Sequence, residues 1–234
     1  MKPTKVYIIR IDTPTSKEYA KVCADSCDKV GMKWEYYDGY MPTSLEHQNE
    51  IWSNFVFPIK WAARLPNGAA GCTMSHAALW KKIADEKDCA IILEHDAIML
   101  QPCNIDIPDD RLVSMGYKYY NAHKYDYETA GAPKQVVDVD HNHGSHAYAV
   151  THIMAQTLVD ELIEHGIRNA IDNVHFLPMR RQFTKTKMAI VDPICALGWL
   201  RDSTIWGKSA TENNVREMLK SFKDNFSGDI VENL

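Results

Sequence analysis

The N-terminal part of the chain alternates between strand-like and helix-like segments, and this alternation constrains the fold more than any other feature. Residues 5–11 are β-prone and nearly all apolar, which is typical of a buried strand. Residues 16–30 carry apolar side chains at helical spacing. Residues 33–37 predict a second strand, closed by the turn signal Asp38-Gly39. A strand, a helix and a strand in so short a stretch form a βαβ unit, so the sequence predicts an α/β fold with a parallel sheet.

The middle of the chain places acidic residues at the end of a predicted strand. Residues 72–87 show a strong amphipathic helical pattern, and residues 89–93 follow as a continuous apolar strand that runs into Glu94-His95-Asp96. Ligands of open α/β sheets gather beyond the carboxyl ends of parallel strands. Because Mn²⁺ and Mg²⁺ need oxygen ligands, Glu94 and Asp96 are candidate metal ligands. A solvated strand end is the alternative interpretation.

A histidine-rich segment at residues 141–146 is a second candidate for metal binding, because imidazole suits Mn, Zn, Ni and Cu. In an extended chain His141 and His143 point the same way, and His146 falls on the opposite side. A closed zinc site needs four ligands, and no cysteine lies close in the sequence. One histidine that completes a metal site is therefore favoured over three, and we take His146 as this ligand. A polar loop is the alternative.

Composition and charge restrict the environment and the partners of the chain. Its 234 residues are 45% hydrophobic and 24% charged, with a formal net charge of −5. These are ordinary values for a globular protein, and an acidic chain attracts nucleic acid and anionic membranes poorly. The six cysteines form no CxxC pair and indicate free thiols in a reducing compartment. No apolar window is long enough to span a bilayer, so we expect a cytoplasmic protein, at most peripheral at a membrane.

Three common enzyme signatures are absent from the sequence. There is no GxxxxGK[ST] and no GxGxxG, which disfavours P-loop and Rossmann dinucleotide chemistry. There is no GxSxG elbow either, which disfavours an α/β-hydrolase.

Taken in order, the segments resemble glycosyltransferase family 25, the group that includes lipooligosaccharide and collagen galactosyltransferases. The most specific match is residues 71–80, which are similar to the G-C-x-x-S-H-x-x-L-W helix of the family. Residues 91–96 resemble its I-x-L-E-D-D strand end, with His95 in the middle place of the acidic triplet. The other matching segments are residues 6–12, 37–39, 144–148, 170–172, 192–194 and 202–205.

This resemblance implies a GT-A-like fold, with a mixed, mainly parallel sheet flanked by helices in a single domain. We expect the glycosyltransferase domain to span residues 1–208, followed by a polar C-terminal tail at 209–234 with one weak helix. The implied activity is inverting transfer of a sugar, galactose or glucose, from a nucleotide sugar. UDP is the expected nucleotide, and a hydroxyl of a glycan or lipopolysaccharide-type acceptor is the expected target.

The resemblance also assigns roles to individual residues. Asp38 and Gly39 should lie near the nucleoside, and Ser75 and His76 should border the donor pocket, although a histidine on an apolar helix face is commonly a hydrogen-bonded core residue. The remaining residues of the expected donor-binding set are Arg10 and Asp12.

The expected metal is Mn²⁺ or Mg²⁺, because a bound cation stabilises the negative charge on the departing diphosphate. Asp96, with Glu94 directly or through water, is the candidate ligand. Inversion needs one general base on the acceptor hydroxyl, and a carboxylate suits this role. Asp172 is the candidate base, and Asp138 and Asp140 are weaker rivals.

Three other functions stay open at this stage. A transferase that acts on modified nucleic-acid bases would use the basic run at residues 180–187, although nucleic acid is not expected as a partner of an acidic chain. A non-catalytic binding module would keep the fold, and the altered acidic triplet would mark lost chemistry. A metal-storage or sensor domain would use His141 and His143 to bind Zn or Ni.

Overall fold

The computed structural model describes residues 1–234 except 61–63, 100, 118–135, 140–143, 172–186 and 198–234. The helices of the described part are α1 (Pro14–Lys29), α2 (Leu45–Ser53), α3 (Asn67–Glu86) and α5 (His152–His165). The strands are β1 (Lys5–Arg10), β2 (Trp34–Asp38), β3 (Cys89–Glu94), β4 (Ala97–Met99), β5 (Arg111–Tyr117), β6 (Val137–Val139), β7 (Ala147–Thr151) and β8 (Lys187–Leu197).

The described strands form one eight-stranded sheet in the order β2-β1-β3-β7-β5-β8-β4, with β6 paired to β8. β1 pairs in parallel with both β2 and β3, so the βαβ unit predicted at the N-terminus is confirmed. Its helix begins earlier than the predicted residue 16, because Thr13 caps α1 and Pro14 occupies the first turn. The parallel strands β1, β2 and β3 therefore end along one edge.

The other half of the sheet is more antiparallel than the sequence predicts. β7 pairs antiparallel with β3 and β5, and β8 pairs in parallel with β5 but antiparallel with β4 and β6. The expected α/β architecture with a mixed sheet is confirmed, while its parallel part is confined to β2-β1-β3 and β5-β8. The sequence could not show this, because pairings such as β3 with β7 join segments far apart in the chain.

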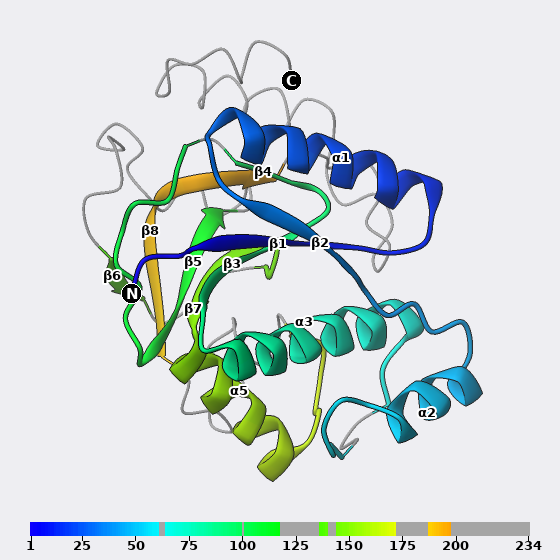
Figure 1. Ribbon diagram of the computed structural model, residues 1–234. Helices are drawn as coiled ribbons and strands as arrows, with labels where there is room; N and C mark the ends of the chain where they lie inside the picture. The colour runs from blue at the N-terminus through cyan, green and yellow to red at the C-terminus, as the bar shows by residue number, and fades with distance from the viewer. Residues whose placement is uncertain (61–63, 100, 118–135, 140–143, 172–186, 198–234) are drawn as a thin grey trace.

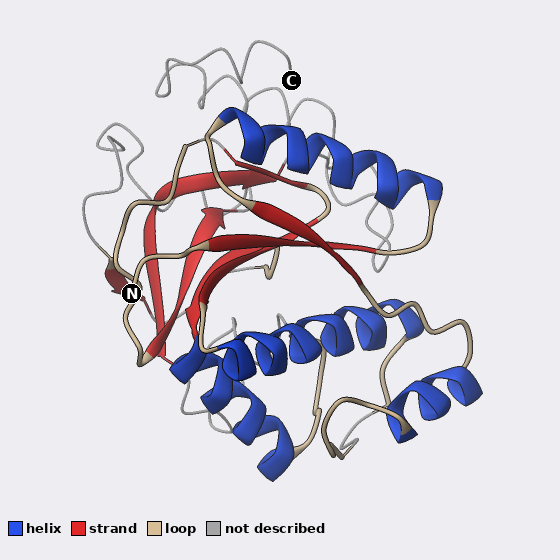
Figure 2. Ribbon diagram, viewed as in Figure 1, coloured by secondary structure: helices blue, strands red, loops and turns tan. Residues whose placement is uncertain are grey.

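Helices cover both faces of the sheet (Figures 1 and 2). α1 lies over one face, where its small side chains pack on the β1 and β3 residues of one parity, such as Ile8 and Ile91. α3 and α5 lie on the other face, against residues of the opposite parity, such as Ile92. In the described part no helix is long and apolar enough to cross a membrane. The two cores hold the carboxyl edge of the parallel strands in a fixed position.

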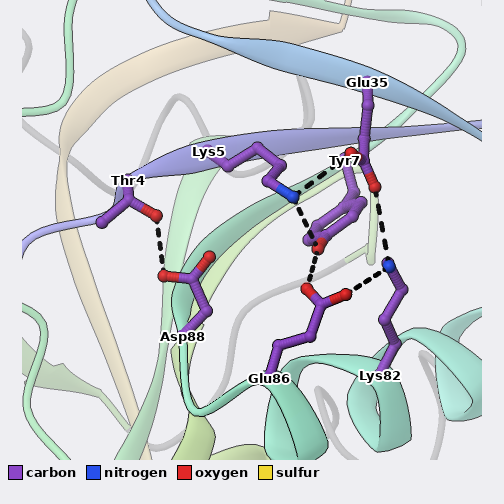
Figure 3. Close-up of polar contacts among 7 residues, drawn as sticks. All are labelled: Thr4, Lys5, Tyr7, Glu35, Lys82, Glu86 and Asp88. Carbon is purple, nitrogen blue, oxygen red and sulfur yellow. Dashed lines mark hydrogen bonds and ion pairs between the residues drawn. The ribbon is translucent and has the colours of Figure 1, made fainter.

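A buried tyrosine in β1 ties three elements together through polar contacts (Figure 3). Tyr7 has no exposed surface, and its hydroxyl donates to Glu86 Oε2 of α3 at 2.7 Å. Lys5 Nζ donates to the Tyr7 hydroxyl at 3.2 Å and to Glu35 of β2, also at 3.2 Å. Burial, and then the Glu86 carboxylate, raise the pKa of Tyr7 well above its usual range. The hydroxyl therefore stays protonated and connects β1, β2 and α3.

We expect Tyr7→Phe to lower the free energy of unfolding by about 1–2 kcal/mol, because a hydrogen bond to a charged group is lost while the ring stays packed. Urea unfolding followed by circular dichroism measures this loss. Tyr36→Phe is the matched control, since the Tyr36 ring contacts Trp34 and Arg10 and its hydroxyl has no hydrogen-bond partner in the described part. Equal stability of the Tyr7→Phe variant and the wild type would contradict the assigned role.

The raised pKa of Tyr7 also gives the stability a pH dependence. An unfolded tyrosine ionises at about pH 10, whereas the folded hydroxyl holds its proton to higher pH. Its contribution is therefore fully present below about pH 10 and is lost as the pH rises further, because only the unfolded chain then loses the proton. Part of the alkaline loss of stability should disappear in Tyr7→Phe.

Candidate active site

Three parallel strands deliver polar side chains to one edge of the sheet. Arg10 ends β1 and pairs in register with Asp38, which ends β2. On the other side of β1, Ile9 pairs with Glu94, which ends β3. The carboxyl ends of parallel strands are where ligands of such sheets bind. All three residues therefore lie at this edge, with Arg10 and Asp38 on one face of the sheet and Glu94 on the other, because Glu94 pairs with Ile9, the neighbour of Arg10 along β1.

Arg10 and Asp38 form the first part of this edge. Arg10 Nε donates to Asp38 Oδ1 at 2.8 Å, and the guanidinium lies 4.0 Å from the centre of the Tyr36 ring. The Asp38 side chain is 81% exposed, so its carboxylate is accessible while Arg10 holds it in place. Asp12, which was predicted for the same site, pairs with Lys17 instead, and this contact lowers the pKa of its fully exposed carboxyl. No contact of Asp12 with the other site residues is observed among the described ranges.

Gly39 and Ser75 join the loop after β2 to helix α3. Gly39 N donates to Arg10 O at 2.7 Å, and a Cβ atom at residue 39 would lie 2.7 Å from Ser75 Oγ. Glycine is therefore required for this close approach. Ser75 Oγ accepts a hydrogen bond from Tyr40 N at 2.9 Å and donates to Gly71 O at 2.7 Å. Ser75 is buried, so its hydroxyl positions the loop and α3 relative to each other.

His76 belongs to a buried hydrogen-bond chain that ends on Glu94. Trp80 Nε1 donates to the Tyr148 hydroxyl at 2.9 Å, and His76 Nδ1 lies 2.7 Å from that hydroxyl. His76 Nε2 lies 3.3 Å from Glu94 Oε1. The chain is satisfied when Tyr148 donates to Nδ1 and Nε2–H donates to Glu94. Burial raises the pKa of Tyr148 well above its usual range, which keeps this proton on its oxygen.

A second donor to Glu94 comes from the residues that immediately precede strand β7. Ser145 Oγ donates to Glu94 Oε1 at 2.5 Å, and Glu94 N donates to the backbone oxygen of His146 at 2.9 Å. The Glu94 side chain is 27% exposed, so the carboxylate is oriented by buried partners and still reaches the surface. His146 itself is buried, with 1% exposure. This residue supports Glu94 through its backbone, and its role as a metal ligand remains a prediction.

The two carboxylates at the end of β3 have different neighbours. Glu94 contacts α3, whereas the adjacent His95 ring stacks on Tyr19 of α1, with ring centres 6.1 Å apart. Burial lowers the pKa of His95, so the neutral imidazole is favoured. A hydrogen bond to Cys27 and burial raise the pKa of Cys23 in α1, with a smaller contribution from the Asp96 charge. Asp96 therefore lies close enough to α1 for its charge to act on Cys23.

A metal-ligand cluster that was not predicted from the sequence lies beside Glu94. Throughout the described ranges, the His, Cys, Asp and Glu side chains close enough to share one ion are those of Cys72, His76 and Glu94, whose ligand atoms all lie within 4.8 Å of one another. Asp96 and His146 do not belong to this group. The signal that could have found Cys72 is its spacing of four residues from His76, which puts both on one helix face.

Several predicted residues lie outside the described ranges. Asp172 is one of them, as are Asp140, His141, His143 and the basic run from residue 180 to 186. Asp138 lies in β6, but its side chain is not described. The chain just before Asp172 is placed, because Ile171 N donates to Thr73 Oγ1 at 3.2 Å and Ile171 is buried against α3. The segment that leads to the candidate base is thus anchored one turn from His76.

Comparison with known proteins gives a family match and distant structural neighbours. The chain matches the sequence profile of glycosyltransferase family 25 (LPS biosynthesis protein) over residues 4–174. No curated protein sequence matches it significantly. The apo form of glycosyltransferase GlyE from Streptococcus pneumoniae has a TM-score of 0.44 at 11% identity, and the match covers 100% of this chain and 63% of that one. This chain therefore spans less than two thirds of the length of GlyE.

Two further solved structures are similar to the chain at low identity. Galactosyltransferase LgtC, in complex with donor and acceptor sugar analogues, has a TM-score of 0.39 at 12% identity, with 96% of this chain and 97% of that chain covered. A glycosyltransferase involved in glycosylation of the major capsid of PBCV-1 has a TM-score of 0.43 at 8% identity, with 92% and 100% covered.

Proposed function

The chain belongs to glycosyltransferase family 25, and from this membership we propose that it moves galactose or glucose from a UDP-sugar to a hydroxyl of a glycan or lipopolysaccharide-type acceptor, with inversion. The glycosyltransferase activity itself follows from the family. The donor, the acceptor and the stereochemistry are our proposal, as are the cytoplasmic location and a peripheral place at the membrane. The observation that supports it best is that Arg10, Asp38 and Glu94 all lie at the carboxyl ends of three neighbouring parallel strands.

Asp38 is the group that we propose binds the nucleoside. Its carboxylate is exposed and is fixed by Arg10, so it can accept hydrogen bonds from the ribose hydroxyls without a large loss of side-chain entropy. Gly39 brings the backbone close to α3 at the same place, since a side chain there would clash with Ser75. These contacts support a shallow donor site whose floor is the end of β1 and β2.

Glu94 and Asp96 fit a hard divalent cation, because both offer oxygen ligands at a strand end and phosphates can supply the rest. Mn²⁺ or Mg²⁺, when bound, would neutralise charge on the departing diphosphate. Ser145 and His76 hold the Glu94 carboxylate in one orientation. Asp96, two residues further along the chain, would add a second carboxylate. The chain thus supplies the negative charge and the orientation that such an ion needs.

A carboxylate base completes the proposed mechanism. Inverting transfer requires a group that takes the proton of the acceptor hydroxyl as it attacks the sugar from the face opposite the leaving group. We propose Asp172 for this role. Its neighbour Ile171 is held on Thr73 of α3, which brings this part of the chain to the side of the site that carries His76.

A thermal-shift panel of nucleotide sugars, each with and without Mn²⁺, tests the donor. We expect the largest rise in melting temperature from a UDP-sugar with Mn²⁺, because a ligand that binds only the folded protein stabilises it. Asp38→Ala should reduce this rise, whereas Asp25→Ala, which removes an exposed carboxylate from α1, should not. A panel without any nucleotide response would overturn the proposed donor class.

Product analysis tests the remaining parts of the proposal. Incubation of the active donor with candidate glycan and glycolipid acceptors should release UDP and yield a new glycosidic bond. The coupling constant of the new anomeric proton then distinguishes inversion from retention. A product that keeps the donor configuration would refute the inverting mechanism and the need for Asp172 while leaving the transferase activity intact.

A further inference from the structure

A thiol, an imidazole and a carboxylate, all potential metal ligands, lie close together beside the carboxyl edge of the sheet. Cys72 and His76 project from one face of α3, four residues apart, and Glu94 reaches them from the end of β3. The sulfur, nitrogen and oxygen atoms lie within 4.8 Å of one another. Cys72 is also the one partly exposed thiol of the six cysteines, the other five being buried. An ion can therefore reach this cluster from solvent.

The separation of two of these ligands suits a tetrahedral ion. Bond lengths of about 2.0–2.2 Å from Zn²⁺ to nitrogen and oxygen, at the tetrahedral angle, separate the two ligand atoms by about 3.3–3.5 Å. His76 Nε2 and Glu94 Oε1 lie 3.3 Å apart. This is long for an N–H···O hydrogen bond, whose common length is about 2.9–3.0 Å. The Cys72 sulfur lies within 4.8 Å of both atoms and is the third ligand of the set.

Hydrogen bonds from neighbouring residues fix the orientation of two of the ligands, His76 and Glu94. A histidine that binds a metal usually uses its other ring nitrogen to donate a hydrogen bond, which fixes the ring. His76 Nδ1 lies 2.7 Å from the buried Tyr148 hydroxyl, and Trp80 supports that hydroxyl from the other side. Ser145 holds Glu94 in the same way. The cluster therefore has the outer contacts that a built metal site requires.

We propose that Cys72, His76 and Glu94 form a Zn²⁺ site, which shares Glu94 with the proposed hard-cation position but takes its other two ligands from α3. A thiolate with an imidazole favours zinc over Mn²⁺ or Mg²⁺, which prefer oxygen ligands. On binding, the Cys72 thiol loses its proton to solvent, and the ring proton of His76 moves from Nε2 to Nδ1, so that Nε2 coordinates the ion and Nδ1–H donates a hydrogen bond to the Tyr148 oxygen. Three protein ligands leave a fourth position for water or a phosphate oxygen. This site goes beyond the proposed transfer reaction and does not depend on it.

Co²⁺ tests the site, because it replaces Zn²⁺ and its thiolate complexes absorb in the near ultraviolet. The metal-free full chain is titrated with Co²⁺, and we expect a thiolate-to-cobalt band that saturates at one equivalent and disappears when Zn²⁺ is added. Cys72→Ser should abolish the band, and Cys103→Ala, which changes a buried thiol on the other side of the sheet, should keep it. Circular dichroism confirms that each variant is folded.

A second, independent variant removes the hydrogen bond between Tyr148 and His76. Tyr148→Phe keeps Cys72 and should weaken Zn²⁺ binding by about 10–100-fold, measured by competition with a chromogenic chelator. A cobalt spectrum without a thiolate band, or a band that persists in Cys72→Ser, would overturn the proposal. The response of Cys72→Ser to UDP-sugar and Mn²⁺ should stay that of the wild type. Loss of the nucleotide response with an intact cobalt band would instead count against the proposed function alone.

Discussion

Asp96→Asn should lower kcat/KM for sugar transfer by about 10²–10³-fold, the effect of losing one group that stabilises transition-state charge. The substitution keeps the size of the side chain and removes its negative charge, so the proposed cation is held less tightly just where the diphosphate departs. We expect the Mn²⁺ concentration for half-maximal activity to rise as well. Steady-state rates of UDP release, measured at a series of Mn²⁺ concentrations, give both kcat/KM and the Mn²⁺ concentration for half-maximal activity.

The control for this variant is Asp25→Asn, which alters an exposed carboxylate on α1 away from the carboxyl edge of the sheet and should leave activity unchanged. Asp96→Asn should also keep the cobalt band of the Cys72 cluster, because Asp96 is not part of that cluster. An unchanged Mn²⁺ dependence in Asp96→Asn would show that the ion is held elsewhere, and Glu94 would then be the next ligand to vary.

The parts of the fold that follow from local patterns could be predicted from the sequence. The continuous apolar runs of β1 and β3 indicate strands buried on both faces, and the charged residues that follow them mark where they end. Parallel pairing of β1 with its neighbours then places Asp38 and Glu94 at one edge. The sequence therefore suffices to predict that these polar residues lie at the carboxyl edge.

The cluster around Glu94 could not be predicted, because it is made by contacts between distant segments. His76 and Tyr148 are 72 residues apart in the sequence, and Ser145 and Glu94 are 51 apart. These contacts exist because β7 pairs antiparallel with β3, a pairing that no local pattern specifies. The spacing of Cys72 and His76 puts both on one helix face, but no local pattern indicates that a strand end approaches them.

We expect Asp172→Asn to lower kcat by about 10²–10⁴-fold, the usual contribution of a general base. The amide cannot take the proton of the acceptor hydroxyl, while the donor should still bind, since donor contacts are assigned to the carboxyl ends of β1, β2 and β3. The thermal shift with UDP-sugar and Mn²⁺ should therefore stay that of the wild type. This combination separates a base from a residue that merely stabilises the fold.

Asp138→Asn and Asp140→Asn are the matched comparisons, because these two carboxylates are the rival candidates for the same proton. If Asp172 is the base, its removal should also eliminate the acid limb of the pH–rate profile, which reports protonation of the base in the free enzyme. Both comparison variants should keep that limb. Loss of the limb in Asp138→Asn or Asp140→Asn, with Asp172→Asn still active, would transfer the role. The segment anchored by Ile171 on Thr73 would then be expected to serve acceptor binding instead of proton transfer, because its contact with α3 is the same whichever carboxylate acts.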